Sequence, residues 1–364
     1  MAIEKGPDGL LTFNIPVEES NQNFTLPSFD EYLNFLNMPE LAECLINKLG
    51  MVTSNEFKGS FVQSTSDKFK VIVGEEFNPI IYRGQNNDYP FMPSSKRYEL
   101  FDGNERVRHS IEWIKKQEFI RLLEMSPYIQ RAKEFKVLDF TYDIDMEAIS
   151  KHYELVSDYL DVTRDLMIAL FFAYTYYDKD TMQILPLPAF EYNTPFLYVG
   201  NLKELYDKAN TSVKNIGFQP VPRAKAQQAM SINLSGDYDY IKSLFKKVEL
   251  PKNPAISKYI YNMFEGGKLL FRDDYISNYA KQVNSLMAFP SDLFIRYCEE
   301  TETDKDWLTE EYTKLGYGFT DITSGIPITD IERINTEIDE IILPYLDDGF
   351  IFRGIKKACE VCYS

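Results

Sequence analysis

The stretch PIIYRGQ, residues 79–85, decides how the rest of the sequence is best interpreted. Its first residues are apolar or aromatic and are typical of a short buried strand. Arg83 follows directly, and an ionised arginine is costly to bury without an anion or another acceptor. Gly84 lets a backbone or a ligand approach closely. The stretch predicts a strand that ends at an anion-binding turn. A structural ion pair for Arg83 is the alternative, and this segment alone favours neither.

Polar residues follow this strand in the sequence. Gln85 follows the glycine, and the run PSSKR at 93–97 adds two hydroxyls and two cations. Hydroxyl and guanidinium donors suit a phosphate or a carboxylate. We therefore place Tyr82, Gln85, Ser94 and Arg97 with Arg83 in a predicted substrate-binding site.

A second candidate segment is KHYELVSDYLDVT, residues 151–163. It contains His152, one of only two histidines in the chain, and Asp161. A carboxylate beside a histidine is a common way to fix its tautomer and make it a base. We predict His152 as general acid or base, oriented by Asp161, with Thr163 capping the buried helix that follows. The alternative is a core histidine bonded to backbone, which the residues alone favour.

The third segment is RAKAQQA, residues 223–229. Amides both donate and accept hydrogen bonds, which suits ribose hydroxyls or the edge of a base. Successive side chains of a strand point to opposite faces, so on a strand at most one of Gln227 and Gln228 would enter a given pocket. We add Arg223 and Gln227 to the predicted binding residues and Gln228 to the catalytic ones. A polar strand edge is the alternative.

Composition narrows the classes of function. The 364 residues are 44% hydrophobic and 26% charged, as in a globular protein, and carry 39 basic against 56 acidic side chains, a net charge of −17. Such a surface repels phosphate backbones, so we expect no extended nucleic-acid face. The four cysteines form no disulfide framework. We find no signal peptide and no apolar run near the roughly 20 residues of a membrane span, and we expect a cytoplasmic protein.

The pattern of elements predicts an α+β fold, a single large mixed domain with a helical C-terminal extension. We divide the chain into a helical lead-in at 1–77, the mixed domain at 78–285 and an acidic helical region at 286–364. Periodicity and capping signals predict an irregular arm at 1–26, helices at 28–37, 40–49, 105–125, 145–155, 164–177 and from 329 onward, and strands at 59–75, 159–161 and 196–200. Signatures of Rossmann, P-loop, zincin and α/β-hydrolase sites are absent.

These segments together resemble the FRG domain. That family has an aromatic-Arg-Gly-Gln element followed by Pro-Ser…Arg, then His-Tyr…Leu-Asp-Trp-Thr before an Ala-Leu-Phe-Phe-Ala helix, then Ala-Gln-Gln-Gly and a final Gly…Leu-Phe. The matching stretches here are YRGQ (82–85), KHYELVSDYLDVT (151–163), ALFFA (169–173), RAKAQQA (223–229) and GKLLF (267–271). Where the family has Arg, Trp and Gly, this chain has Asp158, Val162 and Ala229. The first exchange adds a negative charge next to the predicted site.

FRG domains occur in bacteria and phages, and the resemblance implies no settled activity. By analogy with ADP-ribosyltransferases, Arg83 would hold the pyrophosphate or ribose of a dinucleotide, and Gln228 would stand where a catalytic glutamate is usual. One hypothesis is an enzyme or former enzyme acting on a nucleotide-like or phosphorylated molecule. The other is a non-catalytic interaction or sensor module, in bacterial or phage defence, with a protein partner on the C-terminal helices. The sequence assigns no cofactor and no metal.

Overall fold

The computed structural model describes residues 2–5, 11–14, 24–26, 38–49, 59–63, 68–73, 80–96, 105–134, 136–137, 140–178, 180–181, 183–188, 193–208, 213–215, 221–234, 238–271, 274–322, 336 and 356–357. The helix predicted at 28–37, Arg97 and nearly all of the segment after residue 322 lie outside these ranges. Helices and antiparallel sheets occur together, so the fold is α+β as predicted. No described helix has both the length and the apolar character needed to cross a membrane.

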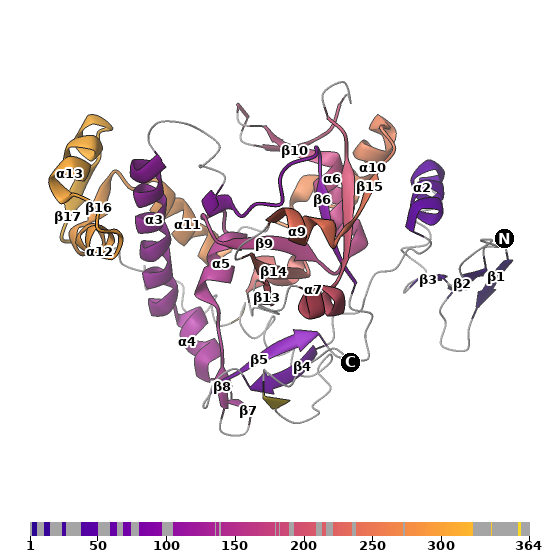
Figure 1. Ribbon diagram of the computed structural model, residues 1–364, viewed down its shortest axis with the longest axis horizontal. Helices are drawn as coiled ribbons and strands as arrows, with labels where there is room; N and C mark the ends of the chain where they lie inside the picture. Colours follow the sequence, from indigo (N-terminus) through magenta and orange to yellow (C-terminus); the bar gives the residue numbers. More distant parts are fainter. Residues whose placement is uncertain are drawn as a thin grey trace.

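The centre of the molecule is a six-stranded sheet that contains the PIIYRGQ strand (Figure 1). Its neighbouring strands all run antiparallel. In spatial order the strands are β13 (Val213–Asn215), β14 (Ala229–Leu234), β9 (Tyr159–Thr163), β6 (Ile80–Gln85), β12 (Phe196–Asn201) and β15 (Lys246–Glu249). The strand predicted at the Arg-Gly motif is confirmed as β6, a central strand of this sheet. Its predicted end at Arg83 and Gly84 is wrong, because both residues pair with β12 and the strand continues to Gln85.

Helix α6 (Leu166–Tyr174) packs directly against β6 (Figure 1). All its residues except Phe172 are buried, so this helix lies inside the core. Its N-terminus is capped by Asp165, which accepts from the Ile168 N–H, so the predicted Thr163 cap is wrong. The helix also ends three residues earlier than predicted. Thr175 starts strand β10 (Thr175–Asp178), because β-branched and aromatic residues there pair with β11 (Gln183–Pro186).

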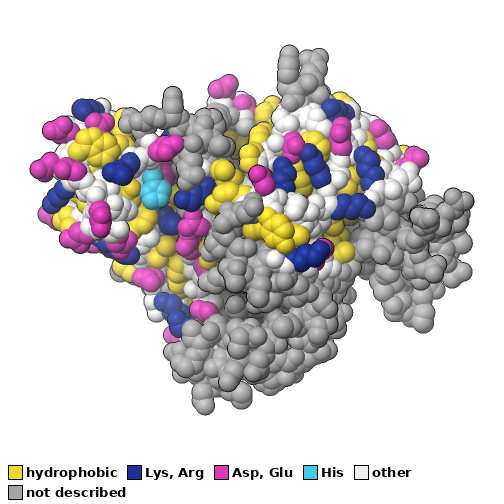
Figure 2. Space-filling view, viewed as in Figure 1, with side chains coloured by type: hydrophobic (Ala, Val, Ile, Leu, Met, Phe, Trp, Pro, Cys, Tyr) yellow, Lys and Arg dark blue, Asp and Glu magenta, His cyan; other side chains and the backbone are white. Residues whose placement is uncertain are grey.

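Two further hydrophobic clusters form around the predicted long helix, α3 (Glu105–Met125). One half of α3 packs with α4 (Pro127–Glu134), α5 (Met146–His152), α8 (Pro222–Ala226) and α11 (Tyr275–Asn284). The other half packs with α12 (Ser291–Thr301) and α13 (Lys305–Lys314). Acidic side chains predominate over the α12–α13 end in Figure 2. A shared core therefore joins this part of the C-terminal region to α3.

The other described elements are smaller. The N-terminal arm, predicted as irregular, contains a three-stranded antiparallel sheet. The remaining elements are β1 (Ala2–Lys5), β2 (Leu11–Asn14), β3 (Phe24–Leu26), α2 (Pro39–Leu49), β4 (Gly59–Gln63), β5 (Lys68–Val73), β7 (Lys136–Val137), β8 (Phe140–Tyr142), α7 (Leu202–Lys208), α9 (Tyr238–Ser243), α10 (Pro254–Met263), the 3-10 turn η2 (Glu265–Gly267), β16 (Ala288–Pro290), β17 (Gly318–Thr320) and β18 (Lys356–Lys357). The predicted helix at 40–49 and the predicted strands at 59–75 are confirmed as α2 and the β4–β5 hairpin.

Candidate functional site

Strands β6 and β9 part from each other next to Arg83. Only Tyr82 and Thr163 are in register between them, whereas β6 and β12 pair over six positions. Beyond that single pair, the Arg83 side chain spans the gap and its Nη1 donates to the Asp161 backbone oxygen at 2.6 Å. A backbone carbonyl at a diverging strand needs such a donor because unpaired buried carbonyls are unfavourable. The divergence opens a cavity of about 250 Å³ beside the strands.

This small cavity brings together most of the predicted polar residues. Its walls come from β6, β9, α6, the end of α5 and the start of β14. The lining residues are Tyr82, Arg83, Gly84, Lys151, His152, Asp161, Val162, Thr163, Phe172, Gln227 and Ala229. A guanidinium, an imidazole, a carboxylate and a carboxamide from distant segments thus share one space. Lys151 and Phe172 also line the cavity, although neither was among the predicted site residues. In the sequence, Lys151 directly precedes His152, and Phe172 belongs to the ALFFA run.

The orientation of His152 is set by Gln227. The Gln227 Nε2 donates to the Leu270 carbonyl oxygen at 3.2 Å, so its Oε1 faces the His152 Nδ1 at 3.3 Å. Because Oε1 can only accept, Nδ1 carries the proton and Nε2 is left as the acceptor of the ring. Burial lowers the pKa of His152 more than the nearby charge of Asp161 raises it. The imidazole is therefore neutral at pH 7, with its basic nitrogen at Nε2.

Asp161 is ionised in the same cavity. Burial by itself raises the pKa of this carboxyl, but the positive charges of Lys151 and Arg83 oppose that effect, and the pKa lies below its usual value. The Lys151 Nζ lies 3.5 Å from Asp161 Oδ2. Asp161 acts on His152 by its charge, whereas Gln227 supplies the hydrogen bond among the described residues. The predicted orienting role of Asp161 thus falls to a carboxamide.

Gln228 is held elsewhere. The pair Gln227–Gln228 lies in the turn between α8 and β14, so the expectation that both stand on a strand is wrong. Gln228 has a positive φ of 41°, and its Nε2 donates to Asp165 Oδ2 at 3.0 Å. It lines neither of the two cavities described here. Its contacts tie this turn to the cap of α6.

Two other predicted binding residues support the fold around the site. Ser94 accepts from the Ser157 N–H at 3.0 Å and donates to the carbonyl of the same residue. Arg223 is buried, lies over the Tyr153 ring at 4.9 Å and donates to the His152 carbonyl at 3.3 Å. Both fix the end of α5 and the segment that follows His152, and neither lines one of the two cavities.

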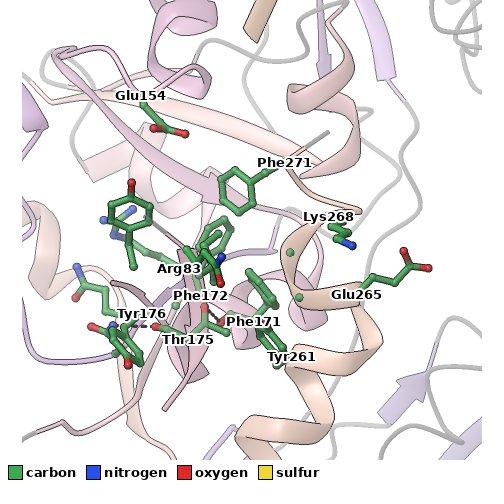
Figure 3. A pocket seen from close by; sticks show the side chains of 18 of the residues that line it. Arg83, Glu154, Phe171, Phe172, Thr175, Tyr176, Tyr261, Glu265, Lys268 and Phe271 are labelled. Carbon is green, nitrogen blue, oxygen red and sulfur yellow. Dashed lines mark hydrogen bonds between the residues drawn. The ribbon is translucent and has the colours of Figure 1, made fainter. Parts of the chain in front are cut away.

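A larger cavity of about 970 Å³ lies on the other side of Arg83 (Figure 3). Figure 3 shows Arg83 among aromatic side chains, with Glu154, Glu265 and Lys268 toward the periphery. Its aromatic lining consists of Tyr89, Phe171, Phe172, Tyr176, Tyr177, Tyr261 and Phe271, and its polar lining includes Gln85, Asn86 and Thr175. Arg83, Gly84 and Phe172 line both cavities, so the two meet at the Arg-Gly motif. Sequence reasoning missed this cavity, although the ALFFA run and GKLLF carried parts of its wall.

A comparison with protein-family models finds the FRG domain over residues 78–182. The chain contains an FRG domain at these residues. No curated protein and no solved structure matches it significantly. The matched span contains Arg83, Gly84, His152, Asp161 and Phe172, so most of the small cavity belongs to the FRG domain itself. Gln227 and the Gly267 turn come from segments beyond it.

The three residues that depart from the family pattern lie in different places relative to the cavities. Asp158 is exposed, accepts from the Ser95 hydroxyl and lines neither of these cavities. Val162 and Ala229 are buried and contribute small apolar surface to the small cavity. Arg164, which could have compensated for the lost arginine, is fully buried and lines neither cavity. The added negative charge at Asp158 therefore lies outside the space that Arg83 borders.

Proposed function

We propose that the FRG domain binds a nucleotide-like or otherwise phosphorylated small molecule, with the anionic group held at Arg83. One observation carries the proposal: Arg83 borders both a small polar cavity and a large aromatic one. A planar guanidinium suits phosphate, and aromatic walls suit a heterocyclic ring. A ligand whose anionic group lies between a heterocyclic ring and a polar group matches this arrangement, with the ring in the aromatic cavity, the anion at Arg83 and the polar group in the small cavity.

The dimensions support a small molecule as the occupant. Binding sites for small molecules commonly measure about 300–1,000 Å³, and the larger cavity, about 970 Å³, lies near the top of that range. The Arg83 guanidinium also lies 5.8 Å from the centre of the Phe91 ring, which holds its orientation. Lys268, at the edge of the same cavity, adds a second positive charge for the approach of an anion.

His152 is the group that we propose for proton transfer. Support comes from its neutral state and its fixed tautomer, which leave Nε2 able to take a proton from a ligand hydroxyl or water. Gln227 acts as the positioning residue, because it fixes the ring without entering the reaction. A carboxamide cannot act as a base, so Gln227 itself takes no proton.

The proposal is tested by calorimetric titration of the wild-type chain with AMP, ADP, ATP and NAD. At least one ligand should bind, and Arg83→Ala should weaken its affinity about tenfold or more, since hydrogen bonds to charged groups contribute about 1.5–3 kcal/mol. Arg296→Ala removes an exposed arginine on α12 and serves as the matched control. Equal binding by wild type and Arg83→Ala, with both proteins folded by circular dichroism, refutes the proposal.

A non-catalytic module is the second candidate. It is favoured by the structural engagement of Ser94, Arg223 and Gln228, three predicted site residues that fasten loops rather than line a cavity. In that case a partner would bind the C-terminal helices, where Trp307 and Leu315 are exposed. His152→Gln would then leave the cellular activity intact while lowering the melting temperature, the opposite of the outcome for an enzyme.

A further inference from the structure

The small cavity presents hydrogen-bond acceptors to whatever enters it. Asp161 is a carboxylate whose side chain is 37% exposed, and its close partner is Lys151 at 3.5 Å. Although part of the side chain is exposed, its second oxygen, Oδ1, is itself buried, and it accepts no hydrogen bond from the described residues. His152 contributes Nε2, since Nδ1 is committed to Gln227. An ionised carboxylate with so few donors is poorly satisfied, and a ligand that brings donors would complete it.

The same charges make the small cavity a poor place for a phosphate. Arg83 and Lys151 are positive, but the Asp161 carboxylate lines the same cavity, lies 3.5 Å from Lys151 and would repel a second anion. Its volume is about eight times the ~30 Å³ that one water occupies, so it holds one small group and not a whole nucleotide. A neutral group with several hydroxyls meets both conditions.

We propose that the small cavity recognises the hydroxyls of a sugar, with Asp161 and His152 accepting hydrogen bonds from neighbouring ribose-type hydroxyls. This inference rests on the proposed function and names its ligand class more narrowly. The ring of the ligand lies in the aromatic cavity and its anionic group lies at Arg83. The geometry thus selects ribonucleotide-like ligands over their deoxy counterparts.

The selectivity for hydroxyl-bearing ligands follows from the free-energy cost of a hydrogen-bond acceptor that is left without a donor. A site built around acceptors loses affinity when the donor is removed, because the buried acceptor has already been separated from water. Removing one hydroxyl opposite a charged acceptor should weaken binding about 10- to 100-fold. Arg83 would contribute equally to both ligand forms, because it contacts the anion rather than the sugar.

The test compares the tightest-binding nucleotide of the titration series with its 2′-deoxy and 2′,3′-dideoxy analogues on the wild-type chain. The ribose form should bind about 10- to 100-fold more tightly than the dideoxy form. Asp161→Asn should remove much of this difference by weakening the ribose form alone. The Arg83 bond goes to the Asp161 backbone oxygen, so the substitution leaves it in place. Asp306→Asn, the same charge loss on the exposed face of α13, is the matched control.

The outcomes separate this inference from the proposed function. Equal affinity of wild type for ribose and deoxy ligands, with Arg83→Ala still weakening both, overturns the hydroxyl inference and leaves the anion site standing. No binding of any ligand overturns both. Because the ligand comparison is made on the wild-type chain, it decides the question even if Asp161→Asn does not fold.

Discussion

Gly84→Ala is the substitution whose effect the structure defines most sharply. A Cβ at residue 84 would lie 1.7 Å from the backbone oxygen of Ala169 and 2.8 Å from the backbone nitrogen of Ala173, whereas real Cβ contacts essentially never fall below 3.0 Å. Both contacts are with the backbone of α6, so no rotamer change relieves them. The helix would have to move away from β6 as a unit.

That movement is opposed from the other side of α6. The helix is buried in the hydrophobic cluster that also contains Tyr82 of β6, and Ser257 of α10 donates to the Tyr174 carbonyl at 2.8 Å. Overpacking a core usually costs about 1–3 kcal/mol. A hard overlap between two backbones should exceed that range, and we expect Gly84→Ala to lower the free energy of unfolding by more than about 4 kcal/mol.

Urea unfolding followed by circular dichroism measures the effect, and two other glycines calibrate it. A Cβ at Gly318 meets nothing within 4 Å, so Gly318→Ala should change the free energy of unfolding by less than about 0.5 kcal/mol. A Cβ at Gly200 meets the Phe245 ring at 2.5 Å, a side chain that can shift, so its cost should lie between the two. Adding Ala169→Gly should not rescue Gly84→Ala. A stability of Gly84→Ala within 1 kcal/mol of wild type would refute the close approach of α6.

Three further outcomes are expected. Burial lowers the pKa of His152, so below about pH 6.5 the unfolded chain binds a proton at this residue that the folded chain does not bind. The free energy of unfolding of wild type should therefore fall between about pH 7 and 5 more steeply than that of His152→Gln, as measured by urea titrations. Gln227→Leu leaves the His152 N–H and the Leu270 carbonyl without their partner and should cost about 1–3 kcal/mol, which an unchanged unfolding midpoint would contradict. The pKa of the Asp88 carboxyl is lowered chiefly by a hydrogen bond from Lys247, but this side chain is 44% exposed. Asp88→Asn should therefore lower the free energy of unfolding by less than about 1 kcal/mol at pH 7. The difference in unfolding free energy between wild type and Asp88→Asn should shrink as the pH falls below about 4.

Local signals in the sequence were sufficient for several elements. The apolar run before Arg83 gave a central strand, and the helical period of 105–125 gave α3, because burial of one face is encoded by residue spacing. Boundaries were less well defined. Both Thr163 and Asp165 can cap a helix, and only packing selects Asp165, since the Thr163 hydroxyl donates instead to the Gln227 carbonyl at 2.8 Å.

The amide pair shows why the site itself needed tertiary information. The side chains of Gln227 and Gln228 were expected to point to opposite faces of a strand. They do point in different directions, but because the two residues lie in a turn in which Gln228 has a positive φ. Which amide enters the cavity depends on where Leu270 and Asp165 lie, and both are distant in sequence. The large aromatic cavity likewise needs η2 to approach α6, a contact that no local pattern encodes.

The sequence by itself determined that this chain carries an FRG domain, that a strand contains Arg83 and Gly84, and that the fold is α+β, because motif identity and residue periodicity are local properties. The tertiary structure alone decided that β6 and β9 part after a single pair, that Gly84 lies against the backbone of α6, and that Arg83 borders two cavities. These features depend on strand register and helix packing between distant segments, which are set by the shape of the whole core.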